Sequence, residues 1–511
     1  MHDVLIIGAG PAGCAAARTL AQCGHQTILV DRPAGSRSAL AESVPPSANR
    51  LLVELGMKNA VEAARFHPWL GNTVWWGSDE PRVEPFATGE SGYQVERERF
   101  DAVLRNEAAK AGAQIVSGTA RAAGALEHQR ALRTHVARPG SQGRDPDEPF
   151  EAKIILDCSG RAGVIARQGL RQAEASHRTV ALVGVWRAKT PWPAQQKGHT
   201  LVAAHADGWA WSVPTSDDVR YFTVMVDPER SRLTKGVPSL DVYLAELRKV
   251  TPFVPWLESA DLIDGPWGAD ASLYSTSQYS GPGFLLVGDA GSFIDPLSSF
   301  GVKKALASGW LAAITANTIL TMPAMADEAR AFYERNEREV VDSFRRQTAD
   351  FASRANHEHP FWEARVDRGQ ANQAALRIRA PYVARPGSQG RDDDDVPTLA
   401  HDPDVLAALH DLRRRPAIHL VQGAHVRTAP RAAIRGNLIV MDDHVFVPAW
   451  PAGVRYLRNI DLLLLLRMAP EYRDVGDLYD AMFQAQPGAS LPDFLGVLST
   501  LIARGALQHK M

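Results

Sequence analysis

The sequence predicts a multidomain protein of the α/β (α+β) class that begins with a Rossmann-like domain. Three observations support this prediction. An apolar run at residues 4–7 is followed by a glycine-rich turn and a helical pattern. Several strand-like runs fall between residues 180 and 230. The chain has 511 residues, which is enough for two or three domains.

Composition and charge narrow the class of protein further. Hydrophobic residues make up 45% and charged residues 22%, as in a globular protein with a sizeable core. The formal net charge is −2, so the chain has no global electrostatic reason to bind nucleic acid or an anionic membrane. Cys14, Cys23 and Cys158 lack metal-site spacing and indicate a reducing compartment. The N-terminal apolar run has no basic flank, so we expect no signal peptide and a cytoplasmic location.

The first domain is expected in three segments, 1–60, 95–170 and 270–345. Residues 4–7 and 27–30 are predicted strands around a helix at 11–22, which makes a β-α-β unit. Further along, 153–156 and 284–287 have the apolar pattern of buried strands, while 100–111 and 302–317 are predicted helices.

A second domain, built on a β-sheet, is expected from residues 61–94 and 171–269. Its predicted strands lie at 74–77, 179–185, 209–213 and 221–226. A helical segment and linker should occupy 346–400. There an aspartate run and Pro397 follow the second copy of a ten-residue repeat, 136–145 and 383–392, whose composition is typical of loops.

The segment 401–511 predicts a winged-helix-like domain. Apolar runs at 438–440 and 445–447 flank Asp442 and Asp443, a pattern typical of a hairpin. Helices are predicted at 459–468, 475–485 and 491–504. Ser490 and Asp493 form a capping pair for the last helix, and Gly505 ends it.

The N-terminal turn has the pattern of a dinucleotide site. Gly8 permits a tight turn, Gly10 lets a pyrophosphate approach the backbone, and Gly13 lets helix and strand pack closely. The helix that starts beyond Gly10, with Ala12 in its first turn, offers N–H groups to phosphates. Asp31, with Arg32 beside it, ends the second strand, where a carboxylate accepts hydrogen bonds from ribose hydroxyls.

Three later strings identify the relatives of this pattern. They are Asp157-Cys-Ser-Gly160, Gly288-Asp-Ala-Gly291 and Asp295-Pro-Leu-Ser-Ser-Phe-Gly301. With the N-terminal turn they resemble, in order, the flavoprotein hydroxylase and halogenase superfamily with its para-hydroxybenzoate-hydroxylase-like fold, over about residues 1–350. The resemblance implies FAD as cofactor and dioxygen as co-substrate. NAD(P)H or a separate flavin reductase would supply the electrons.

The resemblance also implies roles for individual residues. Asp289 would hold the ribityl chain, and the N–H groups of Gly301 and Val302 would face the flavin pyrimidine, where a helix N-terminus stabilises negative charge. Arg97 matches a FAD-contacting arginine, with Arg99 as the alternative, and Glu42 and Ser43 match a loop beside the flavin. The other cofactor residues expected on this basis are Gly8, Gly10, Ala12, Gly13, Asp31, Arg32, Asp157, Gly160 and Pro296.

The stretch Gly208-Trp-Ala-Trp-Ser-Val-Pro214 resembles a string that lines the flavin cavity of flavin-dependent halogenases. Trp209 and Trp211 alternate along a strand, so both should face the same side. With Ser298 they are the predicted substrate pocket, in which an apolar lid would keep water from reactive oxygen. The sequence suggests no general base and no metal ligands.

The resemblance implies that a flavin C4a-hydroperoxide forms, because both the hydroxylases and the halogenases of this superfamily use one. In the family, a halogenase also needs a lysine that falls roughly 70–80 residues from the N-terminus, whereas this sequence has no lysine between Lys58 and Lys110. Tryptophan halogenases further carry a glutamate at the position of Ser298. The missing groups favour hydroxylation. A halogenase acting on an indole, pyrrole or phenol, and a non-catalytic flavin-containing binding protein, remain alternatives.

The C-terminal domain loosely resembles small peptide-binding domains of peptide-modifying enzymes. DNA binding is disfavoured because the helix at 491–504 has Arg504 as its one basic residue. We therefore expect a peptide or protein substrate, docked by this domain, and neither nucleic acid nor membrane as partner; an oligomerisation or lid role is the alternative. The expected reaction is hydroxylation of a tryptophan side chain, as in the flavoprotein monooxygenases that mature tryptophylquinone cofactors.

Overall fold

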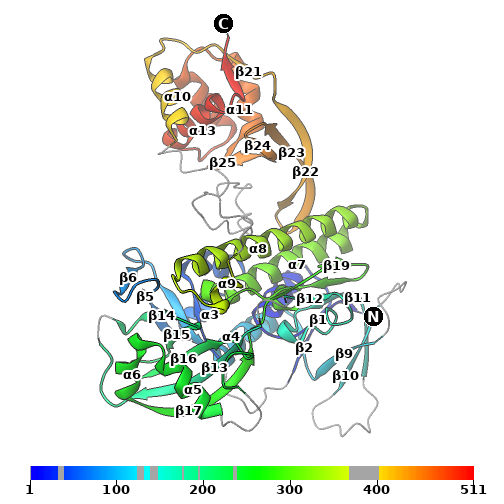
Figure 1. Ribbon diagram of the computed structural model, residues 1–511. Helices are drawn as coiled ribbons and strands as arrows, with labels where there is room; N and C mark the ends of the chain where they lie inside the picture. The colour runs from blue at the N-terminus through cyan, green and yellow to red at the C-terminus, as the bar shows by residue number, and fades with distance from the viewer. Residues whose placement is uncertain are drawn as a thin grey trace. The chain divides into compact units, whose positions relative to one another are not determined.

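The computed structural model describes residues 2–32, 40–123, 132–137, 148–174, 178–193, 196–233, 239–366 and 402–510. It divides into two compact units (Figure 1). The first comprises Met1–Leu320 and Tyr333–Ile378, and the second Thr321–Phe332 and Arg379–Met511. The predicted α/β class is confirmed. Both predicted sheet domains lie in the first unit, and their internal boundaries stay a prediction.

An eight-stranded sheet forms the frame of the first unit. Its central strands are parallel, in the order β20-β11-β1-β2-β8. Their bounds are β1 His2–Ile7, β2 Thr27–Asp31, β8 Gln114–Ser117, β11 Glu148–Asp157 and β20 Phe284–Leu286. The outer strands β9 (Thr119–Ala123), β10 (Leu132–Ala137) and β19 (Ser280–Gly281) are antiparallel. The parallel strands end at one edge, where open α/β sheets bind their ligands.

Four long helices belong to this frame or run alongside it. Helix α1 (Pro11–Gln22) has the predicted bounds and follows β1 directly. Helix α4 (Arg97–Lys110) packs on α1 and starts three residues before the predicted position. Helices α7 (Gly301–Thr321) and α8 (Ala326–Arg354) lie side by side, where Ser308 contacts Glu337 and Phe300 packs on Phe344 (Figure 1).

A seven-stranded sheet, in the order β17-β13-β16-β15-β14-β5-β6, is the second layer of this unit. The strands are β5 Gly71–Trp75, β6 Arg82–Pro85, β13 Val180–Ala188, β14 His199–His205, β15 Gly208–Pro214, β16 Val219–Val226 and β17 Ala260–Asp270. Alternation along β15 sends Ala210 into the core under α5 (Ser239–Arg248) and α6 (Val254–Glu258). Trp209 and Trp211 face the opposite side, as predicted.

Smaller elements connect the two sheets. A three-stranded sheet joins β3 (Ala41–Val44), β7 (Gly92–Glu96) and β4 (His67–Trp69). Strands β12 (Arg171–Ala173) and β18 (Tyr274–Thr276) pair with each other. The remaining helices are α2 (Asn49–Glu54), α3 (Lys58–Ala63) and α9 (Pro360–Glu363). Of the predicted helical segment and linker, the part from 367 to 400 lies outside the described residues, as does the second copy of the repeat.

The second unit has its own apolar core, to which helices α10 to α13 contribute. The helices are α10 Pro403–Arg414, α11 Leu462–Met468, α12 Val475–Ala485 and α13 Leu491–Ala503. The strands are β21 Leu420–Gln422, β22 Arg427–Arg435, β23 Leu438–Val447, β24 Trp450–Val454, β25 Tyr456–Leu457, β26 Ile460–Asp461 and β27 Leu507–His509. Ser490 caps α13 by accepting from the backbone N–H of Asp493, as predicted.

The predicted hairpin around Asp442 and Asp443 is wrong. Both residues lie inside the continuous strand β23, and Asp442 is paired in register with Arg431 of β22. The turn lies earlier, at Gly436, whose φ of +56° is a conformation that favours glycine. Asp442 instead forms an ion pair with Arg435 across the hairpin, and neither aspartate is a turn residue.

Candidate cofactor and substrate site

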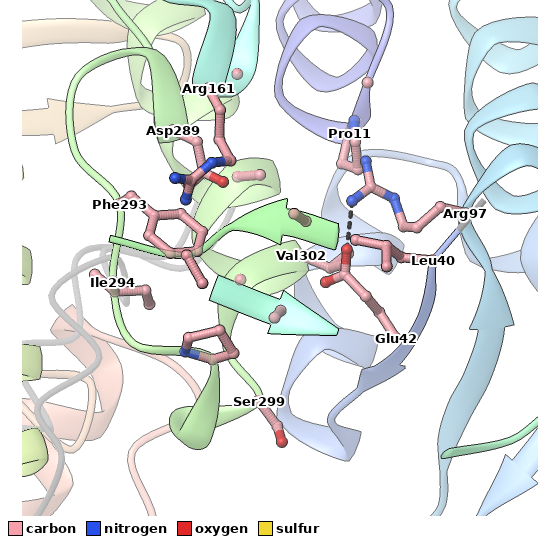
Figure 2. A pocket seen from close by; sticks show the side chains of 18 of the residues that line it. Pro11, Leu40, Glu42, Arg97, Arg161, Asp289, Phe293, Ile294, Ser299 and Val302 are labelled. Atoms are coloured by element: carbon pink, nitrogen blue, oxygen red, sulfur yellow. Dashed lines mark hydrogen bonds and ion pairs between the residues drawn. The ribbon is translucent and has the colours of Figure 1, made fainter. Parts of the chain in front are cut away.

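A cavity of about 350 Å³ opens between the carboxyl edge of the parallel sheet and the seven-stranded sheet (Figure 2). Its cofactor end contains predicted residues from several elements: Gly10, Ala12, Glu42, Ser43, Arg97, Gly160, Asp289, Pro296, Gly301 and Val302. Its sheet wall consists of Ala181, Val183, Trp211, Thr223, Ala269 and Ala271. The structure thus brings together residues that are far apart in the sequence.

The three glycines of the N-terminal turn have different surroundings. Gly8 has φ of +103°, and a Cβ atom there would lie 2.5 Å from the carbonyl oxygen of Cys158. At Gly13 a Cβ atom would lie 1.9 Å from the carbonyl oxygen of Gly8, so helix and strand touch at this point. At Gly10 the nearest atom would be 3.7 Å away, on Arg97. Gly8 and Gly13 therefore satisfy the fold, while Gly10 leaves room at the cavity for a ligand.

Arg97 is held between two carboxylates at the cofactor end. Its guanidinium donates to Glu42 Oε1 at 2.5 Å (Figure 2). It also donates to both oxygens of Asp101, at 3.1 and 3.0 Å. Burial lowers the pKa of Arg97, but the carboxylates of Asp101 and Glu42 outweigh it and raise this pKa. The alternative Arg99 does not line the cavity; it donates to the carbonyl oxygen of Ala64 and lies over the ring of Phe66.

Besides Gly8 and Gly13, three predicted cofactor residues do not line the cavity. Asp157 is fully buried, and its carboxylate accepts from the backbone N–H groups of Ser159 at 3.1 Å and Ile165 at 2.7 Å. It therefore shapes the loop that presents Gly160. Asp31 accepts from Arg105 at 2.5 Å at the end of β2, and Arg32 beside it is exposed.

The Asp289 turn is the 3₁₀ turn η6 (Gly288–Ala290), with Asp289 facing the cavity. Lys304 Nζ lies 3.2 Å from Asp289 Oδ1, and the hydroxyl of Tyr274 donates to the carbonyl oxygen of Asp289 at 2.6 Å. Farther along the cavity, helix α7 begins at Gly301, with its N-terminal backbone beside the carboxylate of Glu42.

The sheet wall is mostly apolar, apart from Thr223 and Asp270, and is backed by aromatic rings. Trp211 lines the cavity and stacks on Trp209, with ring centroids 4.8 Å apart. Trp209 is 2% exposed and lies behind the cavity, in contact with Trp76. Neither lysine nor histidine is among the described residues that line this cavity. The side chain of Ser298, the third predicted pocket residue, lies outside the described part of the structure.

The sequence reasoning missed several lining residues. Arg161 stacks its guanidinium on Phe293 at 4.0 Å and pairs with Asp270 at 3.4 Å. A signal for Arg161 existed, because it directly follows Gly160 in one of the recognised strings. Phe293 lies between two of the recognised strings, and Leu40 lies two residues before Glu42, so both were also within reach of a signal. Asp270 reaches the cavity through a segment with no recognisable pattern.

The donor set of the cavity fits FAD. Open backbone at Gly10, the guanidinium of Arg97, the Asp289 carboxylate and the N-terminus of α7 match a phosphate, hydroxyl groups and an electron-rich ring. Across the described ranges, no group of three or more His, Cys, Asp or Glu side chains is arranged to hold a metal ion. Among the helices that the structure describes, none is long and apolar enough to cross a membrane.

Comparison with known proteins identifies the family. The model described as "FAD binding domain" matches residues 1–307. The chain belongs to this family, and FAD is its cofactor, so the predicted flavoprotein resemblance is confirmed.

Relatives and solved structures place the chain more closely. It is 30% identical over 337 residues to a tryptophan 2-halogenase from Chondromyces crocatus, a match covering 65% of this chain and 64% of that protein. The match thus spans less than two thirds of that relative. The flavin-dependent halogenase CmlS shares its fold at a TM-score of 0.73 and 24% identity, covering 99% of this chain and 96% of CmlS. Peptidyl tryptophan dihydroxylase QhpG, essential for tryptophylquinone cofactor biogenesis, matches at 0.66 and 24%, covering 99% of both chains.

Proposed function

We propose that this protein is an FAD-dependent monooxygenase that hydroxylates a tryptophan side chain in a peptide or protein substrate. The observation that carries the proposal is the sheet wall, which is mostly apolar, contains Trp211, and has no lysine among the described residues around the cavity. A neutral aromatic ring fits such a wall, because it needs shape and dryness more than charged partners.

Bound FAD supplies the chemistry: when reduced, it activates dioxygen. The protein's own residues orient the cofactor and shield the space beside its ring from water. Gly10 and Arg97 are placed for the phosphates, and Asp289 for the ribityl hydroxyls. Val183 and Trp211 keep water from the space beside the ring, which favours transfer of oxygen to the substrate over loss of peroxide.

Halogenation is the second candidate, because the tryptophan 2-halogenase and CmlS are both named halogenases. In this superfamily a lysine is expected to carry the halogen. The buried Lys304 is not available for that task, since its ammonium is engaged by Asp289 and by the carbonyl oxygen of Ser292. Strand β5 (Gly71–Trp75), which is part of the segment where the family's lysine is expected, contains none.

Docking of a peptide by the second unit is part of the proposal. QhpG, whose name gives peptidyl tryptophan as its substrate, matches this chain over its full length, second unit included. In this unit the large apolar side chains of Leu406, Phe483 and Leu491 are exposed by 45 to 46% and offer contacts to an apolar peptide.

The test is a single turnover with reduced enzyme. FAD is reduced without oxygen, then mixed with oxygen and a tryptophan-containing peptide, with and without chloride or bromide, and the peptide is analysed by mass spectrometry. We expect one added oxygen atom whether or not halide is present, because each reduced FAD activates one dioxygen and the second oxygen atom leaves as water. The same peptide with phenylalanine in place of tryptophan is the control and should stay unmodified.

A halogen isotope pattern would establish the halogenase instead. Reduced FAD that fails to react with oxygen would support the non-catalytic binding protein. Free tryptophan modified as fast as the peptide would remove the docking role of the second unit.

A further inference from the structure

The Asp289 turn is fastened by two side chains from one face of helix α7. Ser308 Oγ accepts from the backbone N–H of Gly288 at 2.8 Å, and Lys304 Nζ lies 3.2 Å from Asp289 Oδ1. Lys304 and Ser308 are four residues apart, so they project from the same side of the helix. The turn therefore has two attachments to one rigid element, besides the contact from Tyr274.

Lys304 is unusual for its burial. Its side chain is 0% exposed, and its ammonium also donates to the carbonyl oxygen of Ser292 at 2.5 Å. It lies in the first turn of α7, where the helix dipole disfavours a cation. Burying an ammonium costs free energy, and pairing it with a carboxylate offsets this cost only in part. Apolar side chains of similar volume often stabilise a buried site equally well or better. Stability alone therefore gives little reason for a lysine at this position.

We propose that Lys304 is a positioning residue that holds the Asp289 carboxylate in place and compensates its charge beside FAD. Lys304 does not line the cavity, while Asp289 does, so the lysine acts through the carboxylate. Two electrons and one proton taken up by FAD add one negative charge to the ring. A nearby carboxylate opposes that charge, and a fixed ammonium behind the carboxylate reduces the opposition.

This inference rests on FAD binding, which the family establishes, and not on the identity of the substrate. It holds whether oxygen or halogen reaches the product. A failure of the proposed hydroxylation would therefore leave it standing, and its own failure would leave the hydroxylation proposal untouched.

The first test is the two-electron midpoint potential of bound FAD in Lys304→Met, which keeps much of the side-chain shape and removes the charge. We expect binding of reduced FAD to weaken at least tenfold more than binding of oxidised FAD. That ratio corresponds to a midpoint potential about 30 mV lower. A potential equal to that of the unmodified protein would overturn the proposal.

Lys303→Met is the matched control. Lys303 is the preceding residue of the same helical turn and carries the same charge, but its ammonium donates to Ser47 Oγ at 3.1 Å and lies over the ring of Phe300. We expect its potential to be unchanged. An equal fall in both variants would show a general loss of positive charge and would contradict a specific action on Asp289.

A double-mutant cycle separates positioning from a structural role. Asp289→Asn leaves the ammonium without its carboxylate, so we expect a higher potential. Adding Lys304→Met to Asp289→Asn should not lower the midpoint potential by the about 30 mV expected for Lys304→Met in the native protein. An equal shift in both backgrounds would overturn the proposal.

Lys304→Arg and the double variant cover the case in which Lys304→Met fails to fold. The double variant, Lys304→Met with Asp289→Asn, removes both charges, so neither is left buried without its partner. Lys304→Arg keeps a cation at this position. A native-like potential in Lys304→Arg, together with a raised one in Asp289→Asn, supports the proposal. A midpoint potential in Lys304→Arg that falls by about 30 mV or more, although the cation is kept, contradicts it.

Discussion

The two sides of the cavity are built in opposite ways. At the cofactor end, charged groups are held by more than one partner: Arg97 by Glu42 and Asp101, and Asp289 by Lys304 at its carboxylate and Tyr274 at its carbonyl oxygen. On the sheet wall, small apolar residues surround Trp211, which is supported by ring stacking on Trp209. A cofactor with fixed phosphates and hydroxyls requires fixed polar groups, whereas an aromatic substrate requires shape and dryness.

The two sides meet at a buried polar network. Ser43 of β3 donates to Gln94 Oε1 of β7 at 2.6 Å, and its oxygen lies 2.9 Å from the hydroxyl of Thr200 on β14. Gln94 Nε2 also donates to Thr200 at 2.9 Å. Ser43 lines the cavity, so the network ties a cofactor loop to the seven-stranded sheet. Buried networks that are well bonded rigidify a site and fix its register.

The largest effect is expected from truncation of the sheet wall. Trp209→Ala should lower the free energy of unfolding by about 3–5 kcal/mol, because it empties a fully packed site. Trp211→Ala should cost less, since that ring is only half-buried, but it should increase peroxide release relative to product. Denaturant titration and a coupling assay measure the two effects. Equal loss of stability in both variants would mean that the wall has no distinct lining and supporting layers.

Substitution of two glycines at the cofactor end should have an intermediate effect and should separate the stability of the fold from FAD binding. Gly13→Ala should lower the free energy of unfolding by about 1–3 kcal/mol, because its Cβ has no room against the backbone of Gly8. Gly10→Ala should leave the FAD-free protein as stable as before and weaken FAD binding at least tenfold. Calorimetric binding and thermal unfolding of both variants check this. Unchanged FAD affinity in Gly10→Ala would remove Gly10 from the phosphate site.

The smallest effect is expected from the charged group of Asp207, His205 and Lys249. A hydrogen bond from His205, opposed by burial and supported by Lys249, holds the pKa of Asp207 well below its usual value. A carboxylate whose pKa is lower in the folded state than in the unfolded state, where it is about 3.9, stabilises the fold at pH values above 3.9. This stabilisation is lost as the pH falls toward the pKa of the folded state. Asp207→Asn should therefore unfold with a shallower pH dependence below about pH 4. An identical acid slope would show that the pair contributes nothing.

Prediction from the sequence succeeded for features that depend on local backbone geometry. The turn from Gly8 to Gly13, the bounds of α1 and the alternation of Trp209 and Trp211 follow from spacing alone. It failed where a local pattern had a different partner in space. Asp442 and Asp443 were interpreted as a turn, yet Asp442 pairs with Arg435 across the strands. Asp157 was assigned to the cofactor, yet its carboxylate is used by its own loop.

The sequence by itself determined the class of the protein, because a phosphate-binding turn needs glycines at fixed spacing and a strand on each side of one helix. The cofactor followed from the resemblance of the later strings at 157–160, 288–291 and 295–301 to flavoproteins. Only the tertiary structure decided which charges act at the site. The pairing of Lys304 with Asp289, the stacking of Arg161 on Phe293 and the link from Ser43 to Thr200 join residues that no local spacing relates. These contacts depend on distances between separate elements, and packing of the sheets and helices sets those distances.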